Sequence, residues 1–362
     1  MSNERTRRDG ISTGMPDTLH LICERDVGLF SLIQQVVAHI PWAMSEHRIP
    51  VAVFGNRCCY WTPEGYAGKD TVWEYYFEPV MPTHPADSVP AGVRAAIAGR
   101  YPDPFSVGYR LEDDTVVSSH FGDHPDLNGK TLPTPYLWDD PDEKLRKRAG
   151  VIIQDHVRPR AYLQEKVNAF YDRHMAGRYV IGAHVRGTDA ASAKHETRAH
   201  RLGSLVLENY AKAIQRLLER EPEAKIFVAT DAQASLDYLK GRFGGRVLAY
   251  ESLRHQDGQQ VAGNGPAGWT MPGYIAGDRA RAARNGEEAV IEYLLLSRCQ
   301  FLVHNGSGLA RTVLLAAPSM PHINTHRKNR LVAHLQSGVL GAQQTLLRYA
   351  GKVARPRRER AR

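Results

Sequence analysis

The chain has 362 residues, of which 42% are hydrophobic and 24% are charged, and its formal net charge is +8. This length exceeds that of one ordinary hydrophobic core, so we expect two domains with the composition of a soluble globular protein. No stretch approaches the roughly 18 consecutive apolar residues of a membrane span, so we expect a cytoplasmic protein without one.

The positive charge is unevenly distributed. Much of the excess lies in residues 352–362, which we interpret as a solvated arm, and the polar segment 1–16 is expected to be flexible. A basic balance is compatible with nucleic acid, an anionic membrane or a phosphate-bearing small ligand. Because the basic residues cluster in a terminal arm and no nucleic-acid motif stands out, we expect no nucleic acid partner.

The first ordered unit has a strand–helix–strand pattern. Apolar runs at 17–23 and 48–54 predict two strands, and the helical spacing of apolar residues over 28–44 predicts the helix between them. This βαβ unit implies a parallel sheet in a first domain over residues 17–175. The stretch 56–136 is rich in Pro, Gly and aromatic residues, including the aromatic cluster 71–80, and has little periodicity.

The second unit alternates strands and helices. A helix that begins near Pro159 leads into it. The predicted strands are 179–184, 224–231, 246–250 and 299–304, and the predicted helices are 204–221 with Ser204 as N-cap, 234–243, 286–298 and 307–317. This alternation predicts a doubly wound α/β domain over 176–335, followed by a C-terminal helix and basic tail over 336–362. The Gly/Pro-rich region 251–286 is too long for an inert connection, so we expect a lid or binding loop.

Polar residues follow the predicted strands of this second unit, where ligands of open parallel sheets bind. These residues are His184, Arg186, Asp189, Asp231, Asn305, Gly306, Ser307 and Gly308. A guanidinium holds a phosphate through two parallel hydrogen bonds, and a helix N-terminus offers free N–H groups to an anion. Arg186 facing the helix that begins near Ser307 therefore predicts a phosphate site. The dinucleotide motif GxGxxG is absent.

Each of these residues also has a structural interpretation. Arg186 could form an ion pair with Asp189 or Asp231, and Asp231 could cap the helix 234–243. His184 could be a satisfied core histidine, and Ser307 could be a plain N-cap. Glu292 is either an exposed helical residue or a buried acceptor for the N–H groups of a nucleobase.

The four cysteines, Cys23, Cys58, Cys59 and Cys299, form no CxxC pair. We therefore expect reduced, partly buried thiols and no metal site.

The segments HVRGTD (184–189), IFVATD (226–231) and EEAVIEYLLLSRCQFLVHNGSGLAR (287–311) together resemble the fucosyltransferase superfamily. This superfamily includes the bacterial nodulation fucosyltransferases, the core α1,6-fucosyltransferases and the protein O-fucosyltransferases. The resemblance covers about residues 20 to 320 and is strongest over 151–317.

The resemblance implies a GT-B-like architecture, in which two Rossmann-like domains face a central cleft and the first domain is on the acceptor side. It implies GDP-fucose as donor, inversion at the anomeric carbon, no metal ion or other cofactor, and a glycan or small molecule as acceptor. Arg186 matches the arginine that holds the β-phosphate, and Ser307 the serine that contacts the diphosphate. His184 and Glu292 match positions that contact guanosine, and Asp231 ends the ATD motif.

The chain departs from the core enzymes at several positions. Gly187 stands where they have a second arginine, Ala190 where they have a lysine, and Lys194 at the spacing of their acidic general-base candidate. The base that accepts the acceptor's proton is then Glu196 or Asp189. A transferase for another nucleoside diphosphate sugar and a non-catalytic nucleotide-sugar-binding protein are the alternatives.

Overall fold

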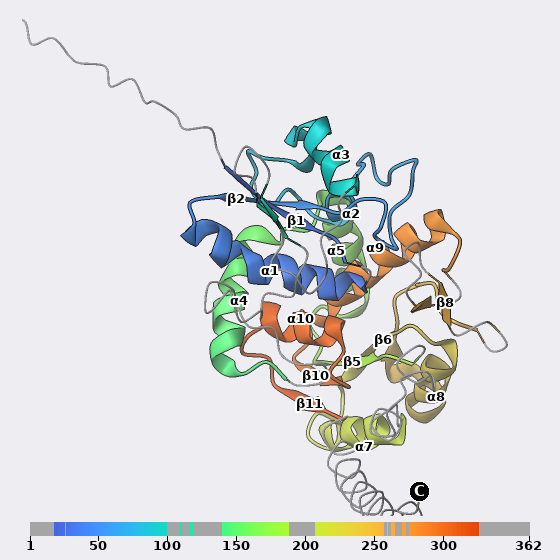
Figure 1. Cartoon of the computed structure of the whole chain (residues 1–362). Coiled ribbons are helices and arrows are strands. Elements are labelled where there is room, and N and C mark those ends of the chain that lie inside the picture. Colours follow the sequence, from blue (N-terminus) through green and yellow to red (C-terminus); the bar gives the residue numbers. More distant parts are fainter. Residues whose placement is uncertain are drawn as a thin grey trace, which may run out of the picture.

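Two sheets, one in each half of the chain, organise the protein (Figure 1). The structure is a computed structural model that describes residues 18–25, 27–99, 109–110, 116–118, 140–187, 207–256, 259, 262–264, 270–272 and 275–325.

The first sheet has the order β2-β1-β4-β3. β1 (Leu19–Cys23) pairs in parallel with β2 (Ile49–Val53), and α1 (Leu29–Ser45) connects them. β4 (Val116–Ser118) is also parallel to β1, whereas β3 (Tyr109–Arg110) is antiparallel to β4. The parallel pairing of β1 and β2 across α1 confirms the predicted βαβ unit. Both strands bury four of their five residues, as strands inside a covered sheet do.

The structure also describes several helices in this half. They are α2 (Val72–Tyr76), the 3-10 turn η1 (Ala86–Ser88), α3 (Ala91–Gly99), α4 (Glu143–His156) and α5 (Ala161–His174). The aromatic cluster 71–80 contains α2, all of which is buried. The helix predicted to begin near Pro159 is α5, which begins at Ala161 after the extended N-cap Arg160.

The second sheet is entirely parallel, in the order β11-β10-β5-β6-β7. Its strands are β5 (Val180–Val185), β6 (Lys225–Thr230), β7 (Val247–Leu248), β10 (Phe301–His304) and β11 (His322–Asn324). Its helices are α7 (Leu207–Leu218), α8 (Gln233–Phe243), the 3-10 turn η3 (Gly244–Arg246), α9 (Arg279–Leu296) and α10 (Gly308–Ala316). The four predicted strands are confirmed, and β11 adds a fifth that the sequence reading missed.

Counted along the chain, this strand order is the Rossmann order 3-2-1-4-5, with β5 as strand one and β10 as strand four. The order reverses between β5 and β10. The fold therefore places a ligand-binding switch point beside the ends of these two strands.

The structure describes parts of the region predicted as a lid or binding loop. This region contains the antiparallel hairpin of β8 (Ala262–Asn264) and β9 (Thr270–Pro272). It also contains the start of α9, which begins at Arg279 and not at 286 as predicted, because the side chain of Asp278 caps the helix at the N–H of Arg281.

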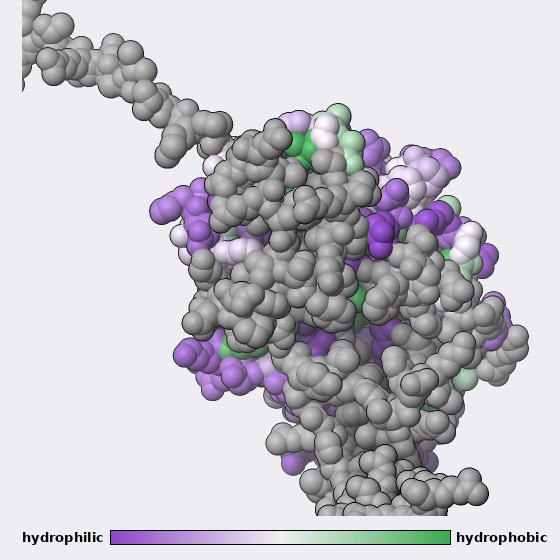
Figure 2. Space-filling view, viewed as in Figure 1, coloured by the Kyte–Doolittle hydropathy of each residue, from purple (hydrophilic) through white to green (hydrophobic). Residues whose placement is uncertain are grey.

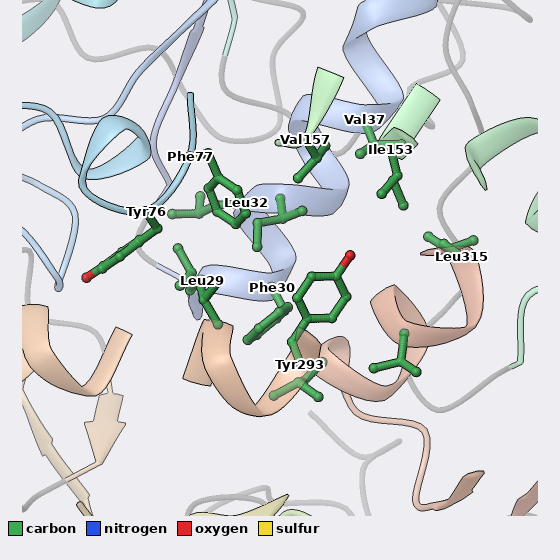
Figure 3. Close-up of a cluster of buried hydrophobic side chains, with 14 of the residues drawn as sticks. Leu29, Phe30, Leu32, Val37, Tyr76, Phe77, Ile153, Val157, Tyr293 and Leu315 are labelled. Atoms are coloured by element: carbon green, nitrogen blue, oxygen red, sulfur yellow. The ribbon is translucent and has the colours of Figure 1, made fainter. Parts of the chain in front are cut away.

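Two apolar layers cover the second sheet. The helices α7 and α8 pack on one face, and α5 and α9 lie on the other. The larger core extends from that second face to α1, α4 and α10 and so joins the two halves. Figure 3 shows Leu29, Phe30 and Leu32 of α1 in the middle of this core. The rings of Tyr76 and Phe77 lie on one side of them, and the ring of Tyr293 in α9 lies on the other.

On the face seen in Figure 2, most of the coloured side chains are hydrophilic. In the part of the chain that the structure describes, large hydrophobic side chains are exposed at Met44, Val151 and Tyr238. Among the helices described, none is long and apolar enough to cross a membrane. All four cysteines are buried and free.

Candidate functional site

The ends of β5 and β10 bring together residues that lie more than a hundred positions apart in sequence. The strands pair in register, with His184 opposite His304. Ser307 Oγ lies 2.9 Å from His184 Nδ1, and Asn305 Nδ2 donates to the backbone oxygen of Arg186 across 3.4 Å. The predicted candidates at the ends of these two strands therefore share one location.

The loop between β10 and α10 presents a helix N-terminus at this location. Ser307 is the N-cap, and its Oγ accepts the N–H of Ala310 at 3.2 Å. Gly306 has φ of +76°, which a residue with a side chain would adopt only with strain. The neighbouring Asn305 is 5% exposed, and among the residues that the structure describes its Oδ1 has no hydrogen-bond partner. A buried oxygen without a donor is costly, so Asn305 Oδ1 is a candidate acceptor for a hydrogen bond from a ligand.

His184 is held as a neutral imidazole. Burial and the nearby Arg186 charge lower its pKa to about 3. Ser307 Oγ lies 2.9 Å from His184 Nδ1, so a hydrogen bond joins the helix cap to the imidazole, and the tautomer of His184 sets which of the two groups donates. Tyr210 fixes the same residue by donating its hydroxyl to the backbone oxygen of His184 at 2.8 Å.

A second buried histidine, which the sequence analysis missed, supports the same loop. The Gly306 N–H donates to His304 Nδ1 at 3.0 Å, so the His304 proton is on Nε2 and is donated to His322 Nδ1, also at 3.0 Å. Burial lowers the pKa of His304 well below its ordinary value. The signal in the sequence was its position as the last residue of the strand before the glycines.

Among the described residues, Asp140, His304 and His322 are also the one group with the spacing of metal ligands, their ligand atoms lying within 4.8 Å of one another. A metal-binding histidine offers a lone pair and donates its other N–H to a neighbour. His304 has the reverse arrangement, because its Nδ1 accepts and its Nε2 donates. The hydrogen bonds therefore favour a neutral histidine pair over a metal centre.

Asp231 does not cap a helix. The N-cap of α8 is Ala232, which makes no side-chain cap bond. Asp231 Oδ1 instead accepts the N–H of Gly187 at 2.7 Å. The capping interpretation was wrong because Asp231 still belongs to the strand end, where it fixes the backbone directly after Arg186.

Glu292 is buried, so its interpretation as an exposed helical residue was wrong. Its side chain is 9% exposed, and Oε1 accepts from Ser252 Oγ at 2.8 Å and from Arg254 Nη2 at 3.4 Å. Burial raises the pKa of Glu292 to about 7, although Arg254 and Ser252 lower it. Asp231 acts electrostatically on the same carboxyl, so Glu292 lies on the side of α9 that faces the strand ends.

Arg186 lies towards the first half of the chain. Its charge lowers the pKa of the Tyr60 phenol, which burial otherwise raises well above the ordinary value. On the other side of the switch point, Gly308 lies close to Phe30 and Ser31 of α1. The site therefore borders both halves. Asp189 and Glu196 lie outside the described residues.

This combination of a Rossmann-ordered sheet with a second parallel sheet against the switch point defines a GT-B-like architecture, and that prediction is confirmed. No protein-family model and no curated protein matches the chain. The structure is similar to the solved fucosyltransferase NodZ from Bradyrhizobium, with a TM-score of 0.51 and 17% sequence identity over 85% of this chain and 94% of that one.

Two further structures of that enzyme are similar to the chain. NodZ alpha-1,6-fucosyltransferase co-crystallized with GDP has a TM-score of 0.50 and 17% identity over 85% of this chain and 95% of that one. The same enzyme soaked with GDP-fucose has a TM-score of 0.50 and 18% identity over 83% and 94%. The chain therefore has the NodZ fold over most of its length.

Proposed function

We propose that this protein is a glycosyltransferase that moves fucose from GDP-fucose to a hydroxyl of a glycan or small-molecule acceptor, with inversion of the anomeric carbon and without a metal ion. The observation that carries the proposal is the position of Arg186 and the α10 N-terminus on either side of the switch point. The NodZ fold supports it, because that enzyme was crystallized with GDP and soaked with GDP-fucose.

The donor's diphosphate would lie between Arg186 and the first turn of α10. Negative charge grows on the β-phosphate as the bond to the sugar breaks. A fixed guanidinium and the free N–H groups of a helix N-terminus stabilise that charge without having to reorganise. The unpaired Asn305 Oδ1 would accept a hydrogen bond from a donor hydroxyl.

The nucleobase would lie towards Glu292 and His184. Guanine has two adjacent N–H groups, and a carboxylate can accept both of them side by side. The hydrogen bonds that Glu292 accepts from Ser252 and Arg254 both go to its Oε1. The imidazole of His184 adds a neutral hydrogen-bonding group at the end of β5. This arrangement favours guanine over bases that lack two adjacent N–H groups.

The acceptor hydroxyl would attack the sugar from the face opposite the diphosphate, in one direct displacement. Its proton would pass to the carboxylate of Glu196 or Asp189. A transferase for a different nucleoside diphosphate sugar would use the same phosphate site, and a binding protein would hold the donor without breaking it.

The test is the substitution Arg186→Ala, with Arg178→Ala as a control of equal charge at an exposed position. We expect the GDP affinity of Arg186→Ala, measured by calorimetry, to fall about 10- to 100-fold, because a hydrogen bond to a charged group contributes about 1.5–3 kcal/mol. Fucose transfer should be abolished while the melting temperature stays near that of the wild type. Arg178→Ala should behave as wild type.

Each alternative has its own outcome. Wild-type turnover in Arg186→Ala would contradict the assignment of the phosphate site. Stabilisation of the wild-type protein by UDP, ADP or dTDP but not by GDP would move the donor to another nucleotide. GDP-fucose binding without transfer or hydrolysis would indicate a binding protein.

A further inference from the structure

A cavity of about 640 Å³ opens at the edge of the second sheet, between α5, α9 and the chain that follows β7. This volume is within the roughly 300–1,000 Å³ of small-molecule sites. Neither Arg186, Glu292 nor Ser307 lines it. The cavity is therefore not lined by these three residues of the candidate donor site, although Glu288, which lines it, lies one helical turn before Glu292 in α9.

The charges that line the cavity are largely neutralised by one another. Lys166 Nζ lies 2.5 Å from Glu287 Oε1, and Arg284 Nε lies 2.8 Å from Glu288 Oε1. Among the described residues that line the cavity, the remaining charged side chain is Glu251. The formal charges of these five side chains therefore sum to −1. Both cations already have a carboxylate partner, so the cavity disfavours a phosphate or another anion.

The walls are held in place before any ligand arrives. Tyr66, from the first half of the chain, donates its hydroxyl to Glu287 Oε2 at 2.7 Å, and the N–H of Leu253 donates to Glu288 Oε2 at 2.6 Å. These bonds fix the carboxylates and the aromatic ring of Tyr66. A fixed wall reduces the entropy that binding a ligand costs.

Aromatic rings and unused polar groups line the same space. The Phe170 ring packs against the rings of His174 and Tyr250, with centroids 4.7 and 5.6 Å apart. In the described part of the chain, the Tyr250 hydroxyl and the Glu251 carboxylate make no hydrogen bond, and Arg284 uses only its Nε. The cavity thus combines aromatic side chains with several hydrogen-bond donors and acceptors.

We propose that this cavity binds a neutral saccharide. A pyranose has an apolar face of C–H groups, which packs on an aromatic ring, and adjacent hydroxyls, which a carboxylate or a guanidinium binds in pairs. The lack of net positive charge excludes sugar phosphates, and the charged lining excludes a lipid. The proposal goes beyond the proposed transfer reaction and does not depend on it.

The test is saturation-transfer NMR and calorimetry with the full-length protein and the disaccharides cellobiose, maltose and lactose. Glucose 6-phosphate and adenosine serve as the anionic and nucleoside probes. We expect at least one disaccharide to bind with a Kd of about 1 mM, typical of a weak small-molecule site. Glu251→Ala and Tyr250→Phe should each weaken that binding about tenfold, because each loses a hydrogen bond to the ligand.

The control is Glu219→Ala, at an exposed carboxylate remote from the cavity, which should bind as the wild type does. Saturating GDP should leave saccharide binding unchanged. The proposal is overturned if none of the disaccharides binds, if glucose 6-phosphate or adenosine binds more tightly, if GDP displaces the sugar, or if the two cavity variants bind as the control does.

Discussion

At the scale of single residues, burial gives the same kind of group different chemistry. His184 and Glu292 are both buried at the strand ends, and burial favours the neutral form of each. For a histidine this lowers the pKa, so His184 is a hydrogen-bonding group and not a cation at neutral pH. For a carboxyl it raises the pKa, so Glu292 changes its charge close to neutral pH.

The raised pKa of Glu292 predicts that the unfolding free energy of the protein depends on pH. The native pKa of about 7 lies above the ordinary 4.5, so the folded protein binds more protons than the unfolded chain between these values. The contribution of this group to stability is therefore present below pH 4.5 and is lost as the pH rises through 7, by up to about 3 kcal/mol. Glu292→Gln should remove this pH-dependent part, measured as the difference between variant and wild-type unfolding free energies.

Ligand binding should show the opposite sign. GDP affinity of the wild type should weaken below pH 7, because a protonated Glu292 no longer accepts two N–H groups, and Glu292→Gln should bind GDP weakly at every pH. Glu165→Gln, at an exposed position on α5, is the control. A wild-type GDP affinity that is independent of pH between about 5 and 8 would contradict this role.

At the scale of elements, the start of α10 combines three functions in four residues. Gly306 supplies the left-handed turn, Ser307 caps the helix and orients His184, and His304 holds the Gly306 N–H. The free N–H groups of the first turn then point out of a fixed loop. Most of the loop's hydrogen bonds are satisfied, and Asn305 Oδ1 is left for a ligand.

This predicts a difference between two helix caps. Ser307→Ala and Asp142→Ala each remove a side-chain cap, from α10 and α4, and should each lower the unfolding free energy by about 1 kcal/mol. Only Ser307→Ala should also weaken GDP binding, because Asp142 caps a helix outside the switch point. Chemical denaturation and calorimetry check the two effects, and equal GDP affinities in both variants would show that Ser307 only caps.

At the scale of the whole molecule, helices hold the two halves together. Gln34 of α1 donates to the Gly308 oxygen at 2.9 Å and to Thr312 Oγ1 at 3.1 Å, both in α10. Tyr76 of α2 donates its hydroxyl to the Ala283 oxygen of α9 at 2.6 Å. Because these contacts lie beside the candidate site, the docking of the halves and the shape of the site are coupled.

Glycine in α9 makes that docking possible. A Cβ on Gly286 would lie 2.3 Å from the Tyr76 hydroxyl oxygen, whereas a Cβ on Gly241 in α8 would meet nothing within 4 Å. Gly241→Ala should stabilise the protein by up to about 1 kcal/mol through helix propensity. Gly286→Ala should destabilise it by about 1–3 kcal/mol through overpacking. Thermal or chemical unfolding checks both signs, and stabilisation by both would show that the halves adjust freely.

The sequence by itself determined the local elements and the class of fold. Apolar runs alternating with helical spacing were enough to locate most strands and helices of the second half, and the strand-end rule singled out Arg186 and Ser307. The division into domains at 175/176 and the identity of the base, Glu196 or Asp189, stay predictions. The start of α9 and the strand β11 were missed, because a polar helical turn and a three-residue edge strand carry little periodicity.

Only the tertiary structure decided which strand ends are neighbours. β10 lies beside β5 through hydrogen bonds between residues about 120 positions apart, and no local pattern encodes such a pairing. The burial of Glu292, the support of Gly306 by His304 and the bond from Gly187 to Asp231 all depend on that strand order. Local propensity therefore placed the arginine at the end of a strand, and long-range packing placed the helix N-terminus beside it.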